Sequence, residues 1–84
     1  MDPAVARQLV RRRLDEGRLP RGGMAEVSVR SGDGQLCDGC GAIVTTDQIA
    51  MSGLAVENWR TLEFHVDCFH IWDVERHLPA GHPV

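Results

Sequence analysis

Three cysteines and one histidine form two short pairs with the spacing of metal ligands. Two residues separate Cys37 from Cys40, two residues separate His65 from Cys68, and 24 residues lie between the pairs. Three thiolates and one imidazole are the number and type of donors that a tetrahedral structural Zn²⁺ site uses. These pairs account for every cysteine in the sequence. We therefore predict that the four residues bind one structural zinc ion.

Other interpretations of the cysteines are weaker. Three is an odd number, so the cysteines cannot form a complete set of disulfide bonds. A redox-active Cys37–Cys40 pair stays open as an alternative, although a helix normally follows such a motif and Gly41 with a strand-like run follows this one. His70 is a competing ligand, but it lies two residues after Cys68 and should point to another side of a helix.

The residues around the pairs predict the elements that position them. A Cys-x-x-Cys turn with Gly39 and Gly41 is typical of a zinc knuckle, because a tight turn needs backbone angles that glycine adopts without strain. Short strands are expected over 42–44 and over 49–56, where Ser52-Gly53 is an interruption. Residues 57–60 can close a hairpin, and 61–64 alternate polar and apolar residues as a half-buried strand does.

After the second pair, the spacing of apolar residues becomes helical from 66 to 78, and Pro79 ends this helix before a loose tail. His65 is then carried by a strand, and Cys68 by the first turn of the helix, whose positive end favours a thiolate. Knuckle, hairpin and helix with ligands on the first and last elements describe a treble-clef-like zinc module. In so small a core, Trp72 is expected to pack around the metal site.

The first residues predict an amphipathic helix over 1–17. Asp2 can cap it, Pro3 suits its first position, and Gly17 is placed to end it. Its apolar stripe consists of Ala6, Leu9, Val10 and Leu14. A helix this short is marginal alone in water, so its stripe must be buried. We expect it to dock on the zinc module, and the alternative is that it is left for a partner.

Residues 18–35 contain four glycines and read as a connector, with a short edge strand over 27–29. The predicted fold is thus a small zinc-stabilised α+β domain with three parts: an N-terminal helix (1–17), a Gly-rich connector (18–35) and a treble-clef-like module (36–84). Eighty-four residues with two Phe, two Trp and no Tyr can form only a modest core, so we expect a bound metal ion to contribute to stability.

The residues around the second ligand pair resemble two families of zinc-binding domains. The run from Phe64 to Phe69 is similar to the first zinc site of LIM domains and to the zinc fingers of poly(ADP-ribose) polymerases, in which an aromatic residue precedes His-x-x-Cys and Phe often follows. This likeness covers residues 36–72. The chain lacks the second ligand set of LIM domains and a basic second half like that of the polymerase fingers.

The whole chain resembles short uncharacterised bacterial proteins that have an N-terminal helix, a Gly-rich connector and a Cys-x-x-Cys…Phe-His-x-x-Cys-Phe-x-x-Trp ending. This resemblance implies the architecture described above and no particular activity.

Composition and motifs favour a binding module over an enzyme. Four protein ligands fill a zinc shell and leave no open position for substrate, and neither a deaminase signature nor a phosphate-binding loop is present. The sequence shows no signal peptide and no apolar stretch long enough to span a membrane, so we expect a cytoplasmic protein. The expected function is that of a protein-interaction adaptor. The alternatives are a zinc–thiolate redox sensor and, less favoured, a nucleic-acid-binding zinc finger.

Charge indicates the kind of partner. The net charge is −3, which disfavours nucleic acid because neutralising phosphate charge dominates affinity for it. Seven arginines against four acids make residues 1–30 the basic part of the chain. We expect a protein partner, with Arg7, Arg11 and Arg12 of the first helix as candidate contact residues.

Overall fold

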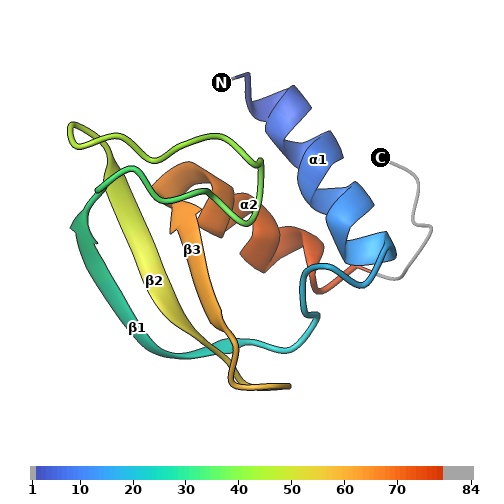
Figure 1. The fold of residues 1–84 in the computed structure, drawn as a ribbon. Coiled ribbons are helices and arrows are strands. Elements are labelled where there is room, and N and C mark those ends of the chain that lie inside the picture. The colour runs from blue at the N-terminus through green and yellow to red at the C-terminus, as the bar shows by residue number, and fades with distance from the viewer. Residues whose placement is uncertain (1, 79–84) are drawn as a thin grey trace.

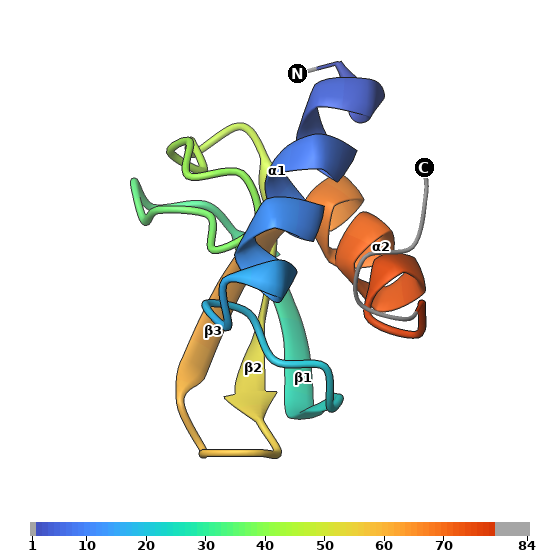
Figure 2. The ribbon, with the colours of Figure 1, turned by 90° about the vertical axis from the view of Figure 1, so that its right-hand side faces the viewer.

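The computed structural model describes residues 2–78. Its elements follow the order α1 (Pro3–Asp15), β1 (Met24–Ser31), β2 (Ile49–Ala55), β3 (Thr61–His65) and α2 (Val66–Glu75). The strands form an antiparallel sheet in the order β1-β2-β3 (Figure 1). Helix α2 lies over one side of the sheet and the segment between β1 and β2 extends on the other, while α1 packs against α2 (Figure 2). The result is the small α+β fold that the sequence predicts.

Helix α1 begins and ends as its sequence indicates. The Asp2 carboxylate accepts a hydrogen bond from the Ala4 N–H at 2.9 Å, and Gly17 beyond the C-terminal end has a φ of 75°, which glycine adopts without a Cβ penalty. The helix buries Ala6, Val10 and Leu14 in the common core. The expectation that this helix docks on the rest of the chain is therefore confirmed.

An aromatic cluster forms the centre of the core. Trp72 stacks on Phe64 with 5.2 Å between ring centroids, and Phe69 contacts both rings. Phe64 belongs to β3 and Trp72 to α2, so the cluster fixes this helix on the sheet. Because both residues lie close in sequence to metal-ligand candidates, the packing also orients the ends of those two elements.

Three predicted elements differ from the structure. Residues 42–44 form no strand; Ile43 makes only an isolated bridge with Leu36. Helix α2 ends at Glu75, three residues before the expected end. Strand β2 runs unbroken through Gly53, because this residue lies opposite a bulge in β1, where a Cβ would stand 2.9 Å from the carbonyl oxygen of Ala25. The expected tail and the helix-ending Pro79 lie outside the described residues.

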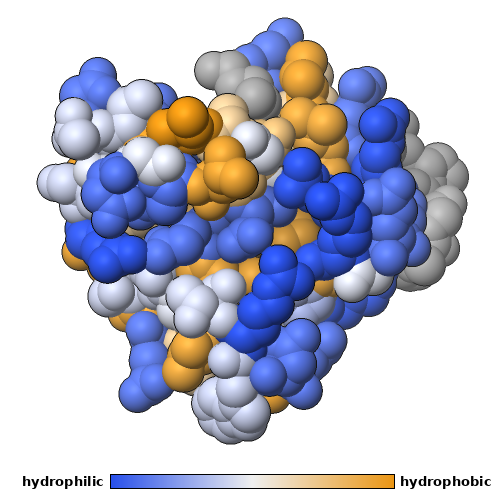
Figure 3. Space-filling model, in the orientation of Figure 1, coloured by the Kyte–Doolittle hydropathy of each residue, from blue (hydrophilic) through white to orange (hydrophobic). Residues whose placement is uncertain are grey.

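The bridge between Leu36 and Ile43 closes the segment that carries the Cys-x-x-Cys turn. Both side chains are exposed to solvent although both are apolar. In Figure 3, hydrophobic residues come to the surface on this face, beside the upper part of α1. The metal-ligand turn is therefore flanked by apolar surface.

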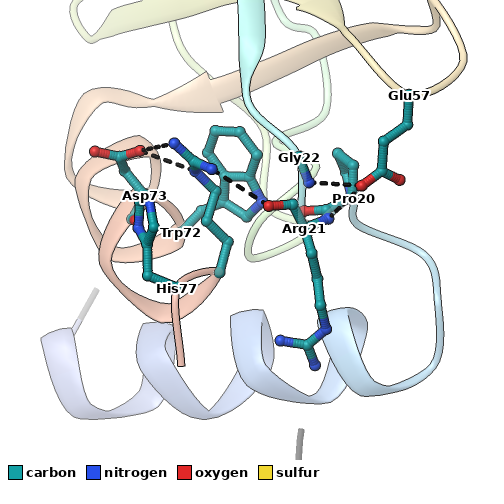
Figure 4. A network of polar contacts seen from close by, with 8 residues as sticks. Pro20, Arg21, Gly22, Glu57, Trp72, Asp73 and His77 are labelled. Atoms are coloured by element: carbon teal, nitrogen blue, oxygen red, sulfur yellow. Dashed lines mark hydrogen bonds and ion pairs between the residues drawn. The ribbon is translucent and has the colours of Figure 1, made fainter. Parts of the chain in front are cut away.

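The predicted connector is tied into the fold at two points. Strand β1 occupies residues 24–31 of it, so the connector supplies one strand of the sheet. Just before β1, the indole N–H of Trp72 donates to the Pro20 carbonyl at 3.0 Å, and the Glu57 carboxylate accepts from the backbone N–H groups of Arg21 and Gly22 (Figure 4). Residues 20–22 are thus held between α2 and the β2–β3 turn.

Candidate metal centre

The four predicted ligands come together where three elements meet. Cys37 and Cys40 belong to the turn before β2, His65 is the last residue of β3, and Cys68 lies in the first turn of α2. Their donor atoms all lie within 4.8 Å of one another. The three cysteines are buried and His65 is half-buried. Sequence spacing alone therefore identified a cluster that the fold assembles.

The spacing of the donor atoms fits a tetrahedral zinc ion. Zinc–ligand bonds of ordinary length at tetrahedral angles require a sulfur–nitrogen separation of roughly 3.6 Å. The His65 Nδ1 atom lies 3.5 Å from the Cys40 Sγ and 3.9 Å from the Cys68 Sγ. The donors, all within 4.8 Å of one another, can close on one ion by small shifts of the sulfurs, and three thiolates with one imidazole nitrogen match the preference of zinc for S and N donors.

A hydrogen bond to His65 selects the ring nitrogen that faces the sulfurs. The Nε2 atom lies 3.1 Å from the carbonyl oxygen of Ile43, so we assign the ring proton to Nε2 as the donor of this bond. Nδ1 then carries the free lone pair and points toward the cysteines. Such a bond to the second ring nitrogen is typical of metal-binding histidines, since it fixes the orientation of the ring.

The electrostatics of the three sulfurs also favour a cation. A hydrogen bond from the Cys68 thiol is the main cause that lowers the pKa of Cys37 to about 4. Donating this bond to Cys37 is in turn the main cause that raises the pKa of Cys68, and burial raises the pKa of Cys40. Protein groups alone thus stabilise one thiolate among the three sulfurs. A dication at their centre would stabilise three.

The turn between the first two ligands is rigid and closely packed. The Gly41 N–H donates to the Cys37 carbonyl at 2.8 Å, and Gly41 has a φ of 83° that other residues rarely adopt. A Cβ on Gly39 would lie 3.1 Å from the Cys68 Cβ and 3.2 Å from the Phe64 ring. Both glycines are needed to bring the turn against the start of α2.

The same turn is hydrogen-bonded to the edge of β3 that faces away from β2. The Asp38 N–H donates to the Glu63 carbonyl at 2.7 Å, and the Asp38 carboxylate accepts from the Glu63 N–H at 2.8 Å. The His65 N–H donates to the Cys37 sulfur at 3.3 Å. Burial is the main cause that raises the pKa of the Asp38 carboxyl, and the bond from Glu63 opposes it. The ligand turn therefore takes the place of a fourth strand.

Helix α1 contributes to the site without supplying a ligand. The Arg13 guanidinium donates to the Asp38 carbonyl at 3.2 Å and lies against Gly41, whose Cβ position is 2.7 Å from an Arg13 nitrogen. This contact joins the first helix to the ligand turn. The roles of Arg13, Asp38 and the Ile43 carbonyl could not be predicted from the sequence, because contacts to backbone atoms leave no pattern in it.

A groove opens on one side of the cluster. It has a volume of about 540 Å³ and lies between the start of α1, the ligand turn and the start of α2. Cys40, His65 and Cys68 line it together with several apolar residues and three polar ones; these are Pro3, Ala6, Ala42, Ile43 and Ile71, and Gln48, Asp67 and His70. Three of the four ligand residues are thus reached from solvent through this groove.

Other candidate residues lie away from the donor atoms. His70 is exposed and contacts Phe69 by its ring, so it is no member of the four-residue cluster. Arg7 and Arg12 are exposed on α1, whereas Arg11 is half-buried and pairs with the buried Glu75 carboxylate of α2 at 3.3 Å. Arg11 therefore links the two helices.

No protein-family model, no curated protein and no solved structure matches this chain. The resemblance of residues 36–72 to LIM and polymerase zinc fingers therefore rests on its residues alone. Neither α1 nor α2 has the length and apolar character that a membrane-crossing helix needs.

Proposed function

We propose that this protein is a non-enzymatic interaction module whose fold is held together by one structural zinc ion. The observation that carries the proposal is the position of the four donors: each of the ligand turn, β3 and α2 supplies at least one. An ion bound there would link three elements that otherwise share only a small core. Structural zinc sites contribute folding free energy in this way.

The donor set argues against catalysis. A catalytic zinc usually has three protein ligands and an open position for water. Here four donors lie within 4.8 Å of one another, and three of them are cysteine sulfurs, whose thiolates would quench the Lewis acidity of the ion. We therefore propose a binding role and assign no reaction to the site.

Cobalt substitution tests this proposal directly. Co²⁺ in place of zinc should give the visible spectrum of a tetrahedral ion with three thiolate ligands, at one ion per chain. Because the shell is full, added azide or cyanide should leave that spectrum unchanged. A spectrum that shifts with these anions would show an open coordination position and would contradict the structural role. Absence of metal from protein purified with zinc would refute the site itself.

The surface beside the metal centre favours a protein partner. Leu36 and Ile43 are exposed apolar side chains on the ligand segment, and Ile43 also lines the groove. Single exposed apolar residues are common, but apolar groups gathered at a groove are typical of interaction sites. Nucleic acid is less suitable, because the acidic chain also engages Arg11, Arg21, Arg30 and Arg76 in ion pairs with its own carboxylates.

Two variants separate the candidate surfaces. Affinity capture with the zinc-loaded protein should be lost in Ile43→Ser if the partner binds at the groove. It should be lost in the double variant Arg7→Ala/Arg12→Ala if the partner binds the exposed cations of α1. Zinc content and melting temperature serve as controls, since all three residues are exposed and neither variant should alter the fold.

A zinc–thiolate redox sensor is the second candidate. Its support is the groove, through which solvent reaches Cys40 and Cys68. Dilute peroxide should then release zinc, and a thiol reductant with added zinc should restore both the metal and the folded spectrum. Zinc that stays bound under these conditions would exclude the sensor.

A further inference from the structure

The two edges of the sheet differ in how they are protected. The Cys37–Asp38 turn covers the outer edge of β3 through its hydrogen bonds to Glu63 and His65. Strand β1 forms the opposite edge, and residues 26–31 are all exposed. Within the described residues, no backbone hydrogen bond reaches the outward side of this stretch. An open edge strand is a template for pairing with another strand.

The register shows which backbone groups are open. The Gly32 N–H donates to the Gln48 carbonyl at 2.9 Å, on the side of β2. Neighbouring residues of a strand direct their backbone groups to opposite edges. The even-numbered residues from 28 to 32 therefore face β2, and the odd-numbered residues from 27 to 31 turn their N–H and C=O groups away from the sheet. Val27 and Val29 thus offer two adjacent pairing positions.

The sequence of this edge is complementary to itself. Residues 26–30 read Glu-Val-Ser-Val-Arg. Consider two copies of β1 paired antiparallel, with a two-fold axis normal to the sheet and midway between their Ser28 residues. This register places Val27 opposite Val29 of the second copy and Glu26 opposite its Arg30. Directly opposite apolar pairs and opposite-charge pairs are the ones that stabilise antiparallel strands. The axis generates each of these pairs twice.

Other symmetric registers fit less well. An axis through Arg30 would bring two guanidinium groups face to face. An axis through Val29 would place Arg30 opposite Ser28 and Glu26 opposite Gly32, so neither charge would meet its counterpart directly. In the favoured register the hydrogen-bonded pairs are Val27 with Val29, the residues whose backbone groups face outward. All three registers pair residues whose backbone groups face outward, so charge and apolar contact select the axis at Ser28.

We propose that β1 pairs with β1 of a second copy of this chain and extends the three-stranded sheet across a two-fold axis. The valine side chains that would meet are 43% and 63% exposed in the single chain. In the single chain the Arg30 side chain reaches across β2 to Glu63 at 2.6 Å and is half-exposed, so pairing with Glu26 of the second copy requires the guanidinium to turn toward the outer edge of β1. Because the β3 edge is covered, assembly stops at the dimer.

The bulge in β1 limits this pairing. The register of β1 with β2 shifts between Ala25 and Ser28, and Glu26 there has a φ of 54°. A bulge disrupts the ladder and bends the strand. Pairing of β1 with a second copy is therefore restricted to the residues that follow the bulge and those directly at it, which specifies a short interface and a single register.

Sedimentation equilibrium of the zinc-loaded full chain tests the proposal. The wild-type protein should dimerise with a dissociation constant below about 1 mM. Glu26→Arg should weaken dimerisation at least about tenfold, because both charge pairs become repulsive. Asp33→Arg, an equal change of charge on an exposed residue outside the pairing register, should have no such effect.

A backbone variant gives an independent test. Val29→Pro removes an N–H that faces outward, so it should abolish the dimer while the ladder with β2 and the zinc content persist. A wild-type chain that stays monomeric up to about 1 mM would overturn the proposal. So would a dimer that neither Glu26→Arg nor Val29→Pro weakens, because its interface would then lie elsewhere.

Discussion

Two valines on α1 allow a matched test of whether this helix belongs to the same cooperative unit as the metal centre. Val10 is fully buried at 0% exposure, in the core that contains Trp72 and Cys68, whereas Val5 is 45% exposed on the same helix. Changing each to Ala removes the same atoms and changes helix propensity by the same amount. The difference between the two variants therefore measures burial.

The expected size of the effect follows from the exposure. Removing two methyl groups from a fully buried site costs about 1.6 kcal/mol in transfer free energy, and the cavity that remains raises the cost to about 2–3 kcal/mol. Because Ala has a better helix propensity than Val, each substitution also raises the free energy of unfolding by up to about 0.5 kcal/mol. Val10→Ala should thus lower the free energy of unfolding by about 2 kcal/mol, and Val5→Ala by less than about 0.5 kcal/mol.

Urea and thermal unfolding of the zinc-loaded proteins, followed by far-UV circular dichroism at one protein concentration, give both values. For a domain of this size, a 2 kcal/mol loss should lower the melting temperature by roughly 8–16 °C. Tryptophan fluorescence, measured in a Trp59→Phe background so that Trp72 is the emitter, should report the same midpoint, because Trp72 shares the core with Val10. Equal effects of the two substitutions, or separate transitions for helix and tryptophan signals, would refute the docking of α1 on the metal module.

Further predictions concern the metal and the residues around it. Chelation, or Cys40→Ala, should unfold residues 36–78 rather than only empty the site, because structural zinc is worth roughly 10–16 kcal/mol of apparent binding energy in finger peptides; NMR shifts that stay dispersed after chelation would contradict this. Gly39→Ala should weaken zinc binding in a competition titration, since its Cβ would meet Cys68 at 3.1 Å and Phe64 at 3.2 Å. The control Gly23→Ala should not, because its Cβ would meet only the Arg76 side chain, at 3.7 Å. Trp72→Phe should cost about 3 kcal/mol by loss of packing and of the bond to the Pro20 carbonyl, whereas the same change at the exposed Trp59 should lie within about 0.5 kcal/mol of zero in urea unfolding.

The ligand cluster could be predicted because its chemistry is local in sequence. Each pair needs only two residues between its members, and few residue types bind zinc, so Cys37, Cys40, His65 and Cys68 are identified without any knowledge of the fold. The N-terminal cap and the glycine end of α1 are local in the same sense. Such features depend only on neighbouring residues, so a prediction made from the local sequence also holds in the folded chain.

The extent of β1 could not be predicted, because it depends on a distant partner. Residues 24–31 lie between glycines and include several polar residues, so the sequence predicts a connector there. In the structure they form a strand that pairs with β2. Gly53 looked like an interruption of β2 for a related reason: its lack of a side chain serves the bulge opposite it. Arg11 likewise looked like a free surface cation, although it pairs with Glu75, 64 residues away.

Metal binding and the edges of the sheet are connected through the ligand turn. The Asp38 N–H of the turn donates to the Glu63 carbonyl, while the Asp38 carboxylate and the Cys37 sulfur accept from the N–H groups of Glu63 and His65. Cys37 is itself one of the four candidate ligands. With the ion bound, β1 is the one edge of the described sheet that remains open, and a two-fold assembly can satisfy it. Loss of the ion would release the turn and open the second edge, and a sheet with two open edges can add copies without closure. The proposed zinc site would therefore stabilise the chain and also limit how many copies it can join.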